Sequence, residues 1–85
     1  MKIKNGFVLT AVGNHSLLVP EGGPASHILS LNRTARFIAA CLQTETTREA
    51  VLEQLAGKYA ALPEDLAESL DVTLDSLREI GALKE

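Results

Sequence analysis

This 85-residue chain has no tryptophan, and its aromatic side chains amount to two phenylalanines and one tyrosine. Because 46% of the residues are hydrophobic, the core must be built almost entirely from aliphatic side chains. A chain this short buries only about 60% of the surface that its unfolded form exposes. We therefore expect a single domain over residues 1–85, with one small core.

Cysteine occurs once, at Cys41, which excludes an intramolecular disulfide and any metal site built on several cysteines. Its neighbours Ile38 and Leu42 favour a small apolar residue packed within a helix over a reactive thiol. No apolar run approaches the roughly 20 residues needed to cross a bilayer, and the run after the N-terminus is too short for a signal peptide. The sequence therefore predicts a cytoplasmic protein without a membrane partner.

The residue patterns on which enzymes depend are missing as well. His15 and His27 have no second ligand at His-x-x-x-His or Glu-x-x-His spacing, and Gly22–Gly23 lacks the spacing of a phosphate-binding loop. Acidic residues recur every three or four positions near the C-terminus, at Glu64, Asp65, Glu68, Asp71, Asp75 and Glu79. Such a row is typical of a solvated helix face and not of a catalytic pair. We predict no catalytic residue, no metal site and no cofactor.

Charge is distributed unevenly along the chain. Residues 1–42 carry four basic side chains against one acidic, a net charge of +3, whereas residues 43–85 carry four against ten, a net charge of −6. An acidic C-terminal half repels phosphate backbones, so nucleic acid is a poor candidate partner.

What the chain does have is an abrupt change of pattern at Asn32. Before it, three short apolar runs at 7–12, 15–20 and 26–31 are separated by turns, which predicts three antiparallel strands. Gly13–Asn14 suits a tight hairpin between the first two, because both residue types tolerate positive φ.

After Asn32, which is a good N-cap, only helical patterns follow. The first helix is expected from about 33 to 42, the second begins at a capping box formed by Thr46 and Glu49, and the third begins at Pro63 and stops at Gly81. The predicted fold class is therefore α+β and winged-helix-like, with a three-stranded antiparallel sheet followed by a three-helix bundle.

The third predicted helix has two useful faces. One arc of the helical wheel is apolar and must face the core: Leu66, Leu70, Leu74 and Leu77. Beside this arc lies a flank of small, uncharged residues: Ser69, Val72, Thr73 and Ser76. The flank is either the ordinary boundary of an amphipathic helix or the wall of a shallow channel.

The third predicted strand makes the channel the better hypothesis. A strand at the edge of a sheet has unpaired N–H and C=O groups, and proteins usually protect such edges with charged residues, proline or bulges. The run 26–31 contains no charged residue apart from His27 when protonated. An open edge beside a helix flank of small residues has the geometry for β-augmentation by a peptide.

The residues Leu31-Asn32-x-Thr34-Ala35 followed by Ile38, with Leu77-x-x-x-Gly81-x-Leu83 near the end, resemble the PqqD family over nearly the whole chain. The resemblance implies a non-catalytic chaperone that binds the leader of a ribosomally made precursor peptide as an added strand. It also implies that the leader is presented to a modifying enzyme, in many systems a radical S-adenosylmethionine (SAM) enzyme. The chain departs from the family at Ala39, where many members have an aromatic residue.

The resemblance further implies which residues bind the peptide, between the third strand and the third helix. Carried over position by position, they are Ser26, His27, Ile28, Leu29, Ser30, Leu66, Ser69, Leu70 and Thr73. Two alternatives stay open at this point. One is a winged-helix DNA-binding regulator, which the acidic third helix disfavours. The other is a structural or dimerisation subunit of a larger enzyme, since an exposed edge can pair with a second copy of the chain.

Overall fold

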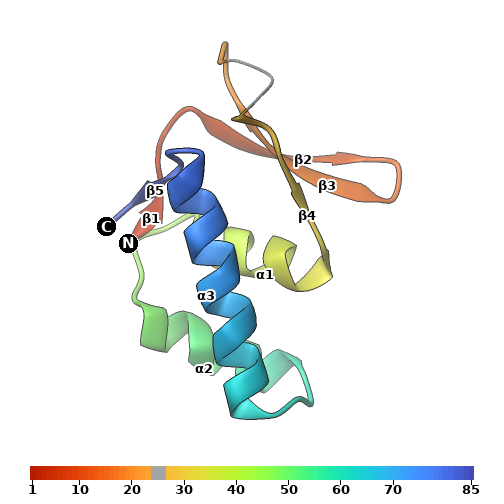
Figure 1. Cartoon of the computed structure of the whole chain (residues 1–85), viewed down its shortest axis with the longest axis vertical. Coiled ribbons are helices and arrows are strands. Elements are labelled where there is room, and N and C mark those ends of the chain that lie inside the picture. The colour runs from red at the N-terminus through yellow and green to blue at the C-terminus, as the bar shows by residue number, and fades with distance from the viewer. Residues whose placement is uncertain (24–26) are drawn as a thin grey trace.

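The computed structural model describes residues 1–23 and 27–85, over which the chain forms two antiparallel sheets and three helices (Figure 1). The strands are β1 (Lys2–Ile3), β2 (Phe7–Val12), β3 (His15–Pro20), β4 (Leu29–Leu31) and β5 (Leu83–Lys84). The helices are α1 (Arg33–Cys41), α2 (Arg48–Lys58) and α3 (Pro63–Glu79). The predicted α+β class is confirmed, but the prediction of a single three-stranded sheet is wrong.

The hairpin of β2 and β3 has the predicted bounds and turn. Its register runs from Phe7 opposite Pro20 to Val12 opposite His15, so that Gly13 and Asn14 form the turn. Gly13 has a φ of +60°, whereas no non-glycine residue of the described chain has positive φ. Positive φ at the first central residue alone is the type II′ pattern, so Asn14 does not take the left-handed conformation that the sequence suggested.

The third strand is half as long as predicted. β4 pairs with β3 through Ser16–Leu31, Leu17–Ser30 and Leu18–Leu29, and the pairing does not extend to Ile28 and His27. In this register His27 would lie opposite Pro20, which has no N–H to donate to the ladder. Position 26 lies outside the described residues.

The second sheet was not predicted, and it joins the two ends of the domain (Figure 1). β1 and β5 pair through Lys2–Lys84 and Ile3–Leu83, and both Ile3 and Leu83 are buried. The backbone N–H of Ile3 also donates to the carbonyl of Leu42 at 2.9 Å. The end of the chain thus folds back on the core through Leu83.

Helix ends follow the expected chemistry, with one correction. Asn32 caps α1, where its Oδ1 accepts from the N–H of Ala35 at 2.7 Å. The predicted capping box at α2 is wrong by one residue: Thr47 is the N-cap, and its Oγ1 accepts from the N–H of Ala50 at 3.1 Å. The N–H of Thr46 instead donates to the carbonyl of Met1 at 3.0 Å, because β1 lies beside it.

The core is aliphatic, as the composition required. Its fully buried side chains come from β3, from all three helices and from the residues that follow α1. The leucine arc of α3 is buried as predicted: Leu66, Leu70, Leu74 and Leu77. None of the helices in the described ranges is both long and apolar enough to cross a membrane.

Candidate functional site

The outer edge of β4 is open. The three-stranded sheet has the order β2-β3-β4, so β3 occupies one edge of β4. Among residues 1–23 and 27–85 no other strand pairs with the opposite edge. Backbone groups that point outward from such an edge can pair with an incoming strand.

A groove lies beside this edge, between β4, the beginning of α1, and α3. It consists of two hollows of about 130 and 220 Å³ that share Asn32, Val72 and Thr73 in their linings and are therefore adjacent. One wall comes from β4 and α1: Leu29, Ser30, Leu31, Asn32, Thr34 and Ala35. The other wall comes from α3: Glu68, Ser69, Val72, Thr73 and Ser76. We call this feature the groove.

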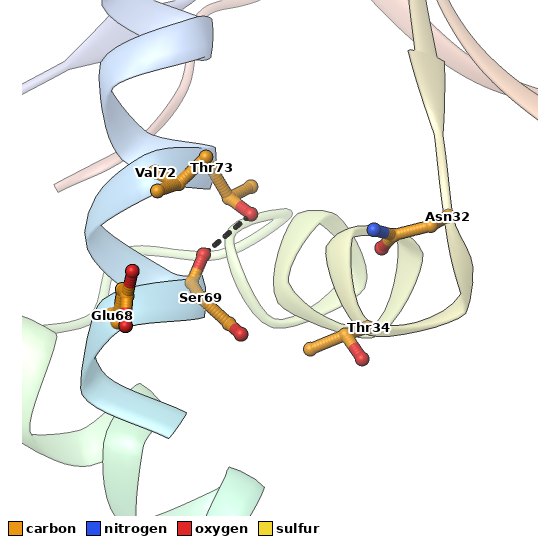
Figure 2. Close-up of a pocket in the computed structure, with 6 residues that line it drawn as sticks. All are labelled: Asn32, Thr34, Glu68, Ser69, Val72 and Thr73. Carbon is orange, nitrogen blue, oxygen red and sulfur yellow. Dashed lines mark hydrogen bonds between the residues drawn. The ribbon is translucent and has the colours of Figure 1, made fainter. Parts of the chain in front are cut away.

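Small side chains keep the groove open (Figure 2). Ser69 and Thr34 project towards one another from α3 and α1. Thr73 donates its hydroxyl to the carbonyl oxygen of Ser69 at 2.9 Å, which satisfies that donor within the helix. Val72 is 59% exposed and offers an apolar contact surface. The groove can therefore accept side chains of modest size along a largely uncharged path.

Most charged side chains of α3 lie on the helix faces away from the groove, and several of them form ion pairs there. Asp71 accepts from Arg48 of α2, from Nε at 2.8 Å and from Nη2 at 3.0 Å. The Arg48 guanidinium lowers the pKa of the Asp71 carboxyl through these hydrogen bonds. Arg78 similarly pairs with Asp75 and Glu85. Glu68 is thus the single charged side chain in the lining of the groove.

The structure brings only some of the predicted peptide-binding residues to the groove. Leu29, Ser30, Ser69 and Thr73 line it, and their contact with a peptide stays a prediction. His27 and Ile28 are exposed and immediately precede β4, outside the lining. The remaining predicted strand residue, Ser26, lies outside the described part of the chain.

Leu66 and Leu70 do not line the groove, contrary to the prediction that placed them opposite the third strand. Both are core residues, with exposed fractions of 5% and 0%, because they belong to the leucine arc of α3. Val72 and Ser76 occupy the α3 wall in their stead. The i, i+3, i+4, i+7 spacing of the small residues from 69 to 76 had indicated this wall, although Val72 and Ser76 were not included among the predicted peptide-binding residues.

The groove presents hydroxyl, amide and apolar side chains and one carboxylate, that of Glu68. Within the described ranges no group of three or more His, Cys, Asp or Glu side chains is placed to hold a metal ion. Cys41 lies outside the groove, where its thiol donates to Oε1 of Gln54 at 3.4 Å. Burial raises the pKa of this thiol, which disfavours the reactive thiolate form.

Comparison with known proteins gives a family and a fold. The family model described as coenzyme PQQ synthesis protein D (PqqD) matches residues 14–83. A solved structure described as TbiB1 in complex with the TbiA(beta) leader peptide is similar, with a TM-score of 0.79 and 18% sequence identity. The superposition covers 99% of this chain and 95% of that chain. No curated protein sequence matches at a significant level.

Proposed function

Because this chain belongs to the PqqD family, we propose that it is a non-catalytic chaperone for a ribosomally made precursor peptide. The leader of that peptide adds to the outer edge of β4 as an extended strand and lays its side chains in the groove. The chain then presents the peptide to a modifying enzyme, for which a radical SAM enzyme in the cytoplasm is our candidate.

The observation that carries this proposal is the open edge of β4 directly beside the wall of small residues on α3. In β-augmentation the backbone ladder supplies affinity, and pockets for alternate side chains supply selectivity. Successive side chains of a strand point to opposite faces, so every second leader residue would enter the groove. An apolar leader residue would contact Val72, whereas a basic residue would be favoured next to Glu68.

Two further facts support a peptide as the ligand. The similar solved structure, by its description, contains a leader peptide. The groove also consists of two adjacent hollows beside α3, whose lining extends from Ser76 to Glu68 along this helix. An extended chain fits this shape better than a compact small molecule, which needs a deeper and more enclosed cavity.

The proposal is tested by titration with synthetic leaders. The probes are peptides that match the N-terminal half of each short peptide encoded beside this gene, each with a scrambled control. We expect saturable amide shifts concentrated in Leu29–Leu31 and in residues 69–76 of α3, with the bound leader extended. Shifts confined to the β2–β3 hairpin, or equal effects from the scrambled peptides, would overturn the proposal.

Chemical changes in the leader backbone test the strand pairing itself. Each leader amide is methylated in turn, which removes one hydrogen-bond donor without changing the side chain. Because alternate residues of a strand direct their N–H groups to the same edge, affinity should fall at every second position. Losses without this two-residue period would exclude β-augmentation, even if the leader still occupied the groove.

Two alternative functions, a DNA-binding regulator and a dimerisation subunit, would use α3 and the edge of β4 respectively. For a winged-helix DNA-binding regulator, α3 would have to contact phosphates, but Arg78 is already paired with Asp75 and Glu85. A dimerisation subunit could pair β4 with β4 of a second copy. Sedimentation with and without leader separates this alternative from ours, because self-pairing and leader binding would compete for one edge.

A further inference from the structure

A second hollow, of about 330 Å³, lies between the β2–β3 hairpin, α1 and the end of α2. It shares no residue with the groove. Three basic and three apolar or aromatic side chains line it, together with one alanine: Arg33, Arg36, Lys58, Leu9, Phe37, Tyr59 and Ala40. We call it the basic hollow.

The cations of the basic hollow have no anionic partner. None of Arg33, Arg36 and Lys58 takes part in an ion pair over residues 1–23 and 27–85. Positions 24–26 are Pro-Ala-Ser and carry no carboxylate. In a chain with a net charge of −3, whose other arginines are both paired, three unpaired cations around one concavity are a notable concentration of positive charge.

Aromatic rings form the apolar part of the basic hollow. Phe37 and Tyr59 pack edge to face, with ring centroids 5.9 Å apart and an interplanar angle of 86°. The ammonium of Lys58 lies 5.7 Å from the centroid of Phe37, which holds this flexible side chain near the rings. Both rings are only half-buried, so they can contact an apolar side chain of a partner.

Helix α1 separates the two sites by its periodicity. Thr34 and Ala35 face the groove, whereas Arg33, Arg36 and Phe37 face the basic hollow. At 100° per residue, positions 33, 36, 37 and 40 form one stripe and positions 34 and 35 lie off it. A ligand in the groove therefore leaves the basic hollow free.

We infer that the basic hollow docks an acidic segment of a second protein. Carboxylates of that segment pair with Arg33, Arg36 and Lys58, and a neighbouring apolar side chain packs on Phe37 and Tyr59. Nucleic acid fits less well, because three cations make a short track and the acidic C-terminal half repels phosphates. The identification of the second protein as the modifying enzyme rests on the proposed function, but the docking of an acidic segment does not.

The test uses a fluorescein-labelled peptide that alternates glutamate with leucine and contains one phenylalanine, together with the same peptide carrying glutamine for glutamate. We expect the acidic peptide to bind, to shift the amides of Arg36, Phe37 and Tyr59, and to lose affinity as NaCl is raised. The double variant R33E/R36E should weaken binding roughly tenfold. The control K4E/K84E makes the same change in net charge on exposed lysines elsewhere and should leave binding within about twofold.

Several outcomes would overturn the inference. One is that the acidic peptide shows no saturable binding. Another is that the glutamine peptide binds as tightly as the acidic peptide. A third is that R33E/R36E and K4E/K84E lose affinity equally. Tighter binding of duplex DNA or of anionic lipid vesicles, abolished by R33E/R36E, would assign the basic hollow to another class of ligand. Circular dichroism must show both variants folded, and R33E/R36E should retain leader affinity, so that failure here is distinct from failure of the proposed function.

Discussion

Arg48 of α2 and Asp71 of α3 form a bidentate pair, with N···O distances of 2.8 and 3.0 Å. The two residues lie 23 positions apart in the chain, and both side chains are exposed. The pair fixes the Asp71 carboxylate beside α2, and Asp71 does not line the groove.

This pair should make stability depend on pH in acid. The folded-state pKa of Asp71 lies below the ordinary value of about 3.9, so the contribution is complete above that value and is lost as pH falls through the folded pKa. Urea unfolding should therefore show a difference between the wild type and Arg48→Gln that is constant above about pH 5 and shrinks below it. The control Lys4→Gln should show no such acid-dependent loss, and a difference that persists unchanged at about pH 2 would exclude Asp71 as its source.

The apolar surface of the groove should be needed for leader binding. Val72→Glu places a charge where we propose an apolar leader side chain, and we expect leader affinity to fall roughly tenfold or more. The matched control is Val12→Glu at the end of the hairpin, where the valine is 56% exposed compared with 59% for Val72. Isothermal titration should show a loss for Val72→Glu alone, and equal losses would mean that added charge acts through long-range repulsion.

Leu70 and Ser69 are adjacent in α3 but should contribute very differently to the free energy of unfolding. Leu70→Ala removes a fully buried side chain and should lower the free energy of unfolding by about 2–5 kcal/mol. Ser69→Ala, one position earlier and exposed, should change it by less than about 0.5 kcal/mol. Denaturant unfolding of both variants checks the assignment, since a small effect of Leu70→Ala would place that leucine on the surface after all.

Two glycine-to-alanine changes should have opposite signs. Gly81 has a φ of +74° and ends α3 in a Schellman motif, with its N–H bonded to the carbonyl of Arg78 and that of Ala82 to Leu77. Gly81→Ala should therefore cost about 1 kcal/mol from the left-handed conformation alone, because an added Cβ meets nothing within 4 Å. Gly57 in α2 is equally uncrowded and has helical φ, so Gly57→Ala should stabilise by up to about 1 kcal/mol. Thermal unfolding monitored by circular dichroism should place the two variants on opposite sides of the wild type.

Hydrophobic periodicity and turn residues predicted the hairpin and the core face of α3 correctly. The hairpin followed from alternating apolar residues around Gly13–Asn14, and the core face of α3 followed from its leucine spacing. β1 and β5 were missed because strands of two residues have no period, and they exist only because the chain ends meet. The N-cap of α2 is Thr47 instead of Thr46, and the N–H of Thr46 donates to the carbonyl of Met1, a residue 45 positions distant in the chain that no local pattern could reveal.

The sequence predicted the elements of the candidate site, and its peptide contacts stay a prediction. The open strand edge and the flank of small residues were both visible in the sequence, and they do meet in the groove. Leu66 and Leu70, which the family resemblance added to the peptide-binding set, are core residues outside the groove lining, in agreement with their place on the apolar arc of the helical wheel. The basic hollow was not predicted, since it brings β2, α1 and the end of α2 together from distant parts of the chain.

In the proposed function, the short length of β4 limits how long a bound leader peptide stays on the chain. A strand of three residues gives an incoming peptide only a few ladder hydrogen bonds, each contributing a net of about 0.5–1.5 kcal/mol. Most of the residence time must then come from side chains seated between the strand and α3, which differ from one cargo to the next. A chain with so short a strand should release its leader quickly. Lengthening β4 by redesign should slow dissociation of the leader and raise affinity, at the cost of slower transfer to the enzyme.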